Sequence, residues 1–314
     1  MAFILTFVII GLFIGFVGVG AAAGFVASLV KDQDVPSKEE LAQDIQQFSQ
    51  TSYIFDRNDK RIGTGELRTA DDRELVTLDE VSPHIIDAFI STEDKEFYDH
   101  DGIVPRSLIR AAYQDLSGSA TTSGGSTITQ QLVKLSVLKN PEQTYSRKAK
   151  EIFLALRLER LFDKEDILSS YLNRIYFGQG ASHEHLYGIE AAAQGIFGIS
   201  AKDVNIAQAA YLAGIPQRPN AYSPFEEDTL QAGTERQHTV LRRMLDNGKI
   251  TEKQFEEAKQ FDIKDSLAKA KEHLYDQYPY LFEAIHESTA IALMKADEVK
   301  IDELEPEQYD ELLT

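Results

Sequence analysis

The segment from Gly124 to Leu135 reads GGSTITQQLVKL, and it places hydroxyl, amide and ammonium side chains between a Gly/Ser-rich loop and an apolar run. A serine or threonine just before apolar residues is typical of a helix N-cap, which accounts for Ser126 or Thr127. A cap alone does not account for the paired glutamines followed by Lys134. We therefore expect a helix here whose first turns carry a candidate binding site.

Helical patterns continue from this segment in both directions along the chain. Apolar residues recur at helical spacing after about Ser146 and mark one face of a long helix. Pro83, a residue tolerated in the first helical turn, precedes another apolar stripe. The Gly/Ser/Thr-rich stretch 114–125 predicts a loop. Because few runs indicate strands and no parallel sheet is indicated, the expected fold class is mainly α.

The N-terminal residues are strongly apolar, with no charged residue before Lys31. Roughly 20 apolar residues suffice to cross a bilayer, so we expect a transmembrane helix over residues 2–30. A cleaved signal peptide is the competing interpretation, but the apolar stretch is too long and lacks a basic flank. A polar juxtamembrane helix or linker follows, and then a β-hairpin over 52–67 that turns around Asn58-Asp59.

The charge balance and the absence of cysteine limit which ligands and which kinds of site this chain can have. With 32 basic and 51 acidic residues, the formal net charge is −19, which argues against general nucleic-acid binding. An anionic ligand would have to meet a local basic cluster. The chain contains no cysteine, which excludes thiol catalysis, zinc ribbons and disulfides.

A first candidate site lies in the segment STEDKEFYDHDG. Glu93, Phe97 and His100 are spaced i, i+4 and i+7, so a continuous helix would present all three on one face. A carboxylate beside an aromatic wall could serve as a general base. The competing interpretation is a capped surface helix, since EDKE alone is typical of a solvated run.

A second candidate site lies in YSRKAKEIFLALRLE. Arg147 and Lys148 precede Glu151 by four and three residues, on neighbouring positions of a helix. Surface ion pairs are the simpler explanation. Together with Lys134 and Arg110, however, they place four cations near the two acid-bearing helices of an acidic chain. A phosphate or pyrophosphate group would suit this cluster, because arginine binds it bidentately and lysine as a point charge.

Five segments in order, EDKEFYDHDG, GGSTITQQLVK, RKAKE, YLNRIYFG and AGIPQRPNAYSP, resemble the motifs of peptidoglycan glycosyltransferase family 51. This family is found in class A penicillin-binding proteins and in monofunctional glycosyltransferases. The resemblance, over residues 82–225, implies a lysozyme-like helical lobe with a small membrane-associated jaw, preceded by one transmembrane helix. It also implies polymerisation of lipid II into β-1,4 glycan strands, with inversion and release of undecaprenyl pyrophosphate.

The resemblance further implies roles for single residues. Glu93 corresponds to the general base that takes the proton from the acceptor sugar's 4-hydroxyl, and Glu151 to a second essential acid near the leaving diphosphate. Lys134 would meet that diphosphate. The other expected substrate-binding residues are Phe97, His100, Arg110, Ser126, Thr127, Gln130, Gln131, Arg147 and Lys148.

Cofactors and partners follow from the same resemblance. A divalent cation, Mg²⁺ or Mn²⁺, could help to neutralise the diphosphate near Glu93 or Glu151, and no organic cofactor is expected. The expected partners are lipid II, the growing glycan strand and membrane lipids, with cell-wall elongation or division proteins as further candidates. Phosphoglycolipids of the moenomycin type should occupy the donor subsite. The expected location is the cell membrane, with one span and an extracytoplasmic catalytic domain.

The expected organisation is an anchor at 1–30, a linker and hairpin at 31–80, a glycosyltransferase domain at 81–250 and an acidic helical tail at 251–314. The tail is expected to lead towards a transpeptidase domain. The S-x-x-K matches at Ser136 and Ser266 lack the partner motifs of that domain, so penicillin binding is not expected of this chain.

One departure from the family pattern is the stretch ASHEHL at 181–186, which adds residues between YFGQG and YGIEAA. It contains His183 and His185, and a His-x-His pair could bind a metal. With no evident third ligand, a surface loop is the favoured interpretation.

Two other functions remain open from the sequence. A lysozyme-like hydrolase or lytic transglycosylase could use the same two acids on finished glycan, although it would have no pyrophosphate to hold. A non-catalytic cell-wall scaffold would have no need of the two acids or the glutamine pair, all of which are present.

Overall fold

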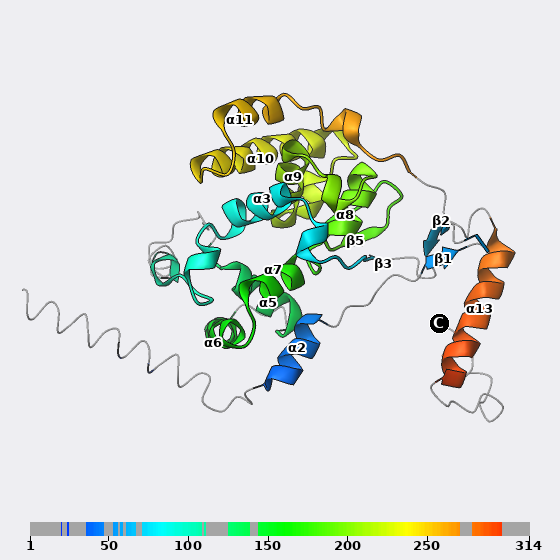
Figure 1. The fold of residues 1–314 in the computed structure, drawn as a ribbon, viewed down its shortest axis with the longest axis horizontal. Helices are drawn as coiled ribbons and strands as arrows, with labels where there is room; N and C mark the ends of the chain where they lie inside the picture. The colour runs from blue at the N-terminus through cyan, green and yellow to red at the C-terminus, as the bar shows by residue number, and fades with distance from the viewer. Residues whose placement is uncertain are drawn as a thin grey trace, which may run out of the picture. The chain divides into compact units, whose positions relative to one another are not determined.

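The computed structural model describes Gly20, Gly24 and residues 36–46, 53–55, 57–58, 61–66, 71–108, 110, 125–138, 144–270 and 278–296. These residues are mostly helical, in agreement with the expected mainly α fold class (Figure 1). In this part of the chain, no helix has both the length and the apolar character needed to cross a membrane. The expected anchor at 2–30, apart from the two glycines, and the expected loop at 114–125, apart from Gly125, lie outside the described residues. The membrane-associated jaw that the resemblance implies stays a prediction.

The chain divides into two compact units, one formed by residues 1–48 and 87–175 and the other by residues 49–86 and 176–314. Helix α3 (Pro83–Glu93) contributes residues to both. The other helices of the first unit are α2 (Lys38–Gln46), α5 (Ile128–Ser136), α6 (Tyr145–Leu161) and α7 (Lys164–Leu172). The helices of the second unit are α8 (Ile189–Phe197), α9 (Ile206–Gly214), α10 (Glu227–Asp246), α11 (Glu252–Lys259) and α13 (Pro279–Ala296).

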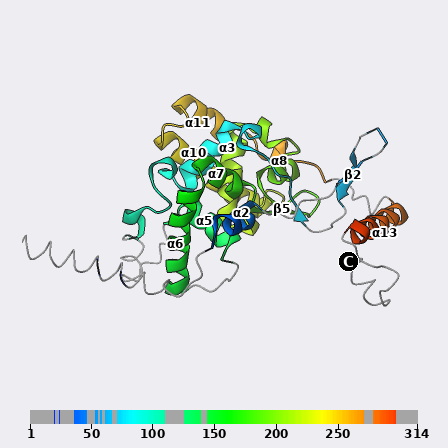
Figure 2. The same cartoon turned by 60° about the horizontal axis from the view of Figure 1, so that its bottom comes forward.

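Helix α5 lies at the centre of the first unit, where it packs against α2, α6 and α7 (Figure 2). The side chains of Leu41 and Ile45 on α2 are fully buried. The guanidinium of Arg157 donates a 2.8 Å hydrogen bond to the backbone carbonyl of Pro36, just before α2. The segment expected to be a juxtamembrane helix or linker is therefore a helix packed into this unit.

Side-chain caps explain where the helices of the first unit begin. The Thr144 hydroxyl accepts a hydrogen bond from the backbone N–H of Arg147, so α6 begins at Tyr145, close to the predicted Ser146. Asp163 caps α7 in the same way. These caps satisfy N–H groups that have no partner inside the helix.

The expectation that Glu93, Phe97 and His100 share one helix face is wrong. Helix α3 ends at Glu93, and Phe97 lies in a separate short 3₁₀ helix, Phe97–Asp99. The carboxylate of Asp94 accepts hydrogen bonds from the His100 ring and from the backbone N–H of Ile128 at the start of α5. These contacts draw the chain away from the helix direction immediately after Glu93.

The strands belong to the second unit. Strands β1 (Tyr53–Phe55) and β2 (Arg61–Glu66) pair antiparallel, which confirms the predicted hairpin. Strands β4 (Tyr176–Gln179) and β5 (His185–Tyr187) also pair antiparallel, and β5 pairs parallel with the two-residue strand β3 (Asp71–Asp72). This short parallel pairing was not expected from the sequence.

The stretch 181–186 is only partly a loop. His183 occupies a turn with a φ of 67°, whereas His185 begins β5 and its Nδ1 lies 2.7 Å from the Tyr176 hydroxyl. Leu186 is fully buried, which anchors the end of the stretch in the second unit. Within the described ranges no group of three His, Asp or Glu side chains could hold a metal ion, at this stretch or elsewhere.

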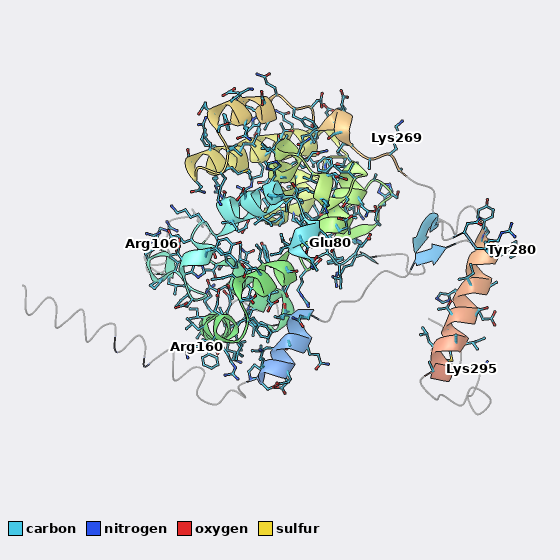
Figure 3. All side chains as sticks on the ribbon, in the orientation of Figure 1. Glu80, Arg106, Arg160, Lys269, Tyr280 and Lys295 are labelled. Carbon is cyan, nitrogen blue, oxygen red and sulfur yellow. The ribbon has the colours of Figure 1, made fainter. Side chains whose placement is uncertain are left out.

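The packing of the second unit is helical apart from these strands. Helix α10 packs against α9 and α11, and α8 packs against β5. Helix α13, in the acidic tail, exposes much of its surface. Figure 3 labels two of its residues, Tyr280 and Lys295, and the Tyr280 side chain is 91% exposed.

Candidate active site

Glu93, the candidate general base, is the last residue of α3 and its side chain is partly buried. The amide Nε2 of Gln131, on α5, donates a 2.8 Å hydrogen bond to the Glu93 carboxylate. The hydroxyl of Tyr171, on α7, donates a 3.1 Å hydrogen bond to Oε1 of the same glutamine. A chain of two hydrogen bonds thus connects three helices and ends on the carboxylate.

Tyr171 is held in its protonated form. Burial raises the pKa of its hydroxyl well above the usual value, and the nearby negative charges of Glu93 and Asp94 add to this effect. The protonated hydroxyl can donate, and the ionised carboxylate can only accept. Gln131 therefore directs its carbonyl oxygen to Tyr171 and its NH₂ group to Glu93.

Glu151, the second candidate acid, lies in α6 and is buried. Its carboxylate forms an ion pair with the ammonium of Lys148, three residues earlier on the same helix, as their spacing predicted. The same ammonium donates a 3.0 Å hydrogen bond to the Ser126 hydroxyl, just before α5. The structure thus brings together three of the expected site residues in one cluster.

Two residues of the opening segment have a structural role. Thr127 caps α5 and forms a capping box with Gln130, in which each side chain binds the other residue's backbone N–H. Both side chains are almost completely buried, with exposures of 2% and 0%. The capping box therefore accounts for Gln130 as well as Thr127, so the interpretation that a cap does not explain the glutamine pair is wrong for Gln130. The expected contacts of these two residues with a substrate stay a prediction.

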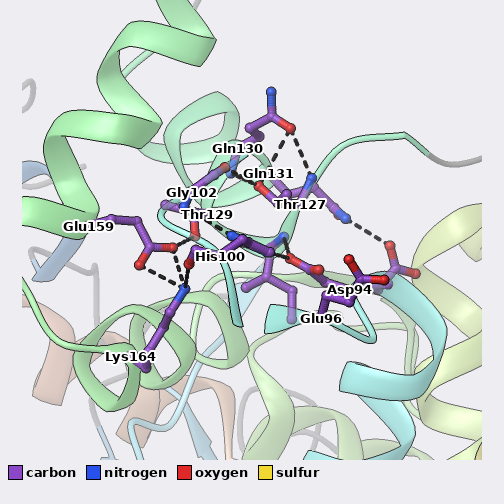
Figure 4. A network of polar contacts seen from close by, with 12 residues as sticks. Asp94, Glu96, His100, Gly102, Thr127, Thr129, Gln130, Gln131, Glu159 and Lys164 are labelled. Atoms are coloured by element: carbon purple, nitrogen blue, oxygen red, sulfur yellow. Dashed lines mark hydrogen bonds and ion pairs between the residues drawn. The ribbon is translucent and has the colours of Figure 1, made fainter. Parts of the chain in front are cut away.

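A network of polar contacts joins the segment that follows Glu93 to α5, α6 and α7 (Figure 4). The backbone N–H of Gly102 donates to Nδ1 of His100, so Nδ1 is the acceptor and Nε2 carries the proton that is donated to Asp94. Asp94 also accepts the backbone N–H of Ile128, the first residue of α5. A carboxylate at this position is stabilised by the positive end of the helix dipole.

Gly102 in this network adopts a conformation that favours glycine. Its φ is +92°, and a Cβ atom there would lie 2.7 Å from the backbone carbonyl oxygen of Ala155. The Gly102 carbonyl in turn accepts a 2.6 Å hydrogen bond from the Thr127 hydroxyl. This close approach ties the segment after α3 to α5 and α6.

A second part of the network joins α5, α6 and α7. Lys164 forms an ion pair with the buried Glu159, and its ammonium donates a 2.7 Å hydrogen bond to the His100 carbonyl. The Thr129 hydroxyl donates to the same glutamate. The Lys164 ammonium also lies 4.4 Å from the centre of the Phe97 ring, which is fully buried. Phe97 and His100 are thus part of the packing and hydrogen bonding of the first unit, and their expected contacts with a substrate stay a prediction.

Sequence reasoning missed Asp94, Glu159, Lys164 and Tyr171. Asp94 lies in the segment STEDKEFYDHDG, but the residues EDKE that contain it are typical of a solvated run. Each of these side chains bonds to at least one residue in another helix or loop, and helical periodicity carries no information on such pairs. Lys134 and Arg110 have exposed side chains, and Arg147 is partly buried at the start of α6.

Neither candidate glutamate belongs to a group of three metal-ligating side chains within the described ranges. The Glu93 carboxylate accepts a hydrogen bond from the Gln131 amide, and the Glu151 carboxylate forms an ion pair with the Lys148 ammonium. The expected Mg²⁺ or Mn²⁺ stays a prediction, and no step proposed below passes through a metal ion.

A family model described as Transglycosylase matches residues 59–245, a range that includes both candidate glutamates. Penicillin-binding protein 1A of Aquifex aeolicus (strain VF5) is 39% identical over 236 residues, which are 75% of this chain and 30% of that protein. Penicillin-binding protein 1A of Escherichia coli (strain K12) is 42% identical over 184 residues, which are 59% of this chain and 21% of that protein. This chain therefore spans about a third or less of the length of these two relatives.

A further relative, penicillin-binding protein 1A/1B of Bacillus subtilis (strain 168), is 38% identical over 247 residues, which are 78% of this chain and 26% of that protein. Among solved structures, penicillin-binding protein 1A from Haemophilus influenzae aligns with 71% of this chain and 22% of its own. The TM-score of that alignment is 0.39 and the sequence identity is 22%.

Proposed function

Because this chain belongs to the transglycosylase family, glycosyltransferase family 51, we propose that it polymerises lipid II into β-1,4-linked glycan strands. The observation that carries this proposal is the partly buried Glu93 carboxylate, which lies inside the matched range and is oriented by the Gln131 amide. A carboxylate held in this way can act as a general base.

In the proposed reaction, the 4-hydroxyl of the acceptor sugar attacks the anomeric carbon of the donor. The new C–O bond forms as the bond from the anomeric carbon to the pyrophosphate oxygen breaks, with inversion at that carbon. The hydroxyl proton moves to Glu93. The Gln131 amide binds Oε2 of this carboxylate, which orients the carboxylate to accept the proton.

The leaving undecaprenyl pyrophosphate gains negative charge as the bond breaks. We place it near Lys148, whose ammonium lies between the Ser126 hydroxyl and the Glu151 carboxylate. Lys134 and Arg147 would supply further positive charge. Fixed cations stabilise a developing negative charge more strongly in the transition state than in the ground state.

The substrate also implies a location and partners. Lipid II carries a polyprenyl tail, so the reaction must take place at a bilayer surface, which agrees with the apolar segment at 2–30. We propose a single-pass membrane protein with an extracytoplasmic catalytic domain that contacts membrane lipids and the growing glycan strand. Cell-wall elongation or division proteins are further candidate partners.

The test is to incubate the protein in detergent with labelled lipid II, and in a parallel reaction with finished glycan strands. A polymerase converts lipid II into a ladder of long products on a gel and leaves finished strands intact. Shortening of the finished strands without polymerisation would instead identify a hydrolase or lytic transglycosylase. No change in either substrate would leave the scaffold as the remaining function.

A further inference from the structure

We propose that Tyr171 is a positioning residue for catalysis: its hydroxyl holds the Gln131 side chain in the one orientation that directs an N–H group at Glu93. This inference rests on the proposed function, in which Glu93 is the general base. Tyr171 itself would not touch the substrate. It would act through Gln131 by keeping the base in place.

The Gln131 amide can face Glu93 in two ways, and only one of them is favourable. With its NH₂ group towards the carboxylate, the glutamine donates a hydrogen bond. Rotated by half a turn, it would oppose its carbonyl oxygen to the carboxylate oxygens, and two acceptors repel each other. A glutamine side chain has several rotatable bonds, and a second contact that favours the same orientation restricts them further.

Tyr171 provides that contact because it is itself rigid. Its ring is 1% exposed and packs edge-on against Phe89, with ring centroids 6.3 Å apart and an angle of 80° between the planes. The residue lies within α7, and its neighbours Leu168 and Leu172 are buried. A hydroxyl at the end of a ring fixed in this way donates from a constant position to the Gln131 carbonyl.

The second unit offers a matched control. Tyr211 on α9 is also 1% exposed and packs edge-on against an aromatic ring, that of Phe197. Its hydroxyl donates a 3.0 Å hydrogen bond to the backbone carbonyl of Tyr222, and burial raises its pKa as well. Tyr211 therefore resembles Tyr171 in burial and bonding, but its hydrogen bond ends on backbone and not on a candidate site residue.

The experiment is a double-mutant cycle with Tyr171→Phe, Gln131→Met and the two changes combined, assayed for lipid II polymerisation in detergent. Phenylalanine keeps the packed ring and removes only the hydroxyl. We expect Tyr171→Phe to lower kcat by about three- to tenfold, the effect of one neutral hydrogen bond, with KM for lipid II within about twofold. In the Gln131→Met background, Tyr171→Phe should have no further effect on kcat.

Tyr211→Phe separates positioning from a general loss of stability. We expect both tyrosine variants to lower the thermal unfolding midpoint by a similar amount, while Tyr211→Phe retains wild-type kcat. Gln131→Ala replaces Gln131→Met in the cycle if the methionine variant does not fold.

Three results would overturn the inference: an unchanged kcat in Tyr171→Phe, losses that add independently in the double variant, or an equal loss of kcat in Tyr211→Phe. A Glu93→Gln protein that keeps its activity would refute the proposed function instead. If Glu93→Gln is inactive and the cycle is additive, only the positioning role fails.

Discussion

The two candidate glutamates lie in contrasting surroundings. Glu93 is partly buried and receives its hydrogen bond from a neutral amide, whereas Glu151 is 4% exposed and contacts the ammonium of Lys148. Hydrogen bonds to a charged partner are stronger than those to a neutral one. In the proposed function, the Gln131 amide orients the Glu93 carboxylate, whereas the Glu151 carboxylate orients the Lys148 ammonium.

The largest expected effect is that of replacing Glu93, the glutamate bound by the neutral amide. Glu93→Gln keeps the shape of the side chain but cannot accept a proton, so we expect polymerisation to fall by roughly 10²-fold or more. Gel analysis of labelled lipid II products measures it. Asp99→Asn, which removes an exposed acid from the same segment, is the control and should retain activity. Activity above about a tenth of wild type in Glu93→Gln would remove Glu93 from its role.

The next effect concerns the cations expected around the diphosphate. A phosphoglycolipid of the moenomycin type should bind to the wild-type protein, and Lys134→Ala and Arg147→Ala should each weaken binding by about tenfold to a hundredfold. This range corresponds to the loss of one charge-assisted contact, roughly 1.5 to 3 kcal/mol. Calorimetry measures the affinities. Lys253→Ala, on the exposed surface of α11, is the control. Equal affinity in all four proteins would contradict the donor-site assignment.

Breaking the ion pair of Glu151 should reduce stability. Lys148→Met leaves a buried carboxylate without its cation, and we expect the free energy of unfolding to fall by about 1 to 3 kcal/mol. Adding Glu151→Gln should restore part of this loss, because the uncompensated charge is then removed. Urea unfolding monitored by circular dichroism measures both changes. If the double variant is less stable than Lys148→Met alone, the buried charge is not the cause of the loss.

The smallest expected effect is that of removing the N-cap of α6, the helix that carries Lys148 and Glu151. This change tests whether the start of the helix affects the polymerisation rate as well as stability. Thr144→Ala removes an exposed N-cap, and such a loss typically costs about 1 kcal/mol of stability. We expect the thermal midpoint to fall by a few degrees while the polymerisation rate stays within about twofold of wild type. A polymerisation rate more than twofold below that of wild type would show that the site depends on the exact start of the helix.

Local features of the sequence predicted several elements of the two units. The apolar stripe predicted the start of α6 within a residue or so, because helical periodicity is a local signal. The Lys148–Glu151 pair followed from a spacing of three residues on that helix. The hairpin β1–β2 followed from a turn signal between two strand-like runs. The ordered motifs identified the family and, with it, the two candidate acids.

The contacts that orient these acids were decided by the tertiary structure. The bond from Gln131 to Glu93 joins residues 38 positions apart, and the bond from Tyr171 to Gln131 spans 40. Asp94 binds the start of α5 across 34 positions, and α3 ends just before it, so Glu93 and His100 do not share a helix. Periodicity reports which face of a helix is apolar, but it does not report which buried polar group on another helix will satisfy a given donor. That choice depends on how the helices pack, because a buried polar group must find a partner wherever the fold provides one.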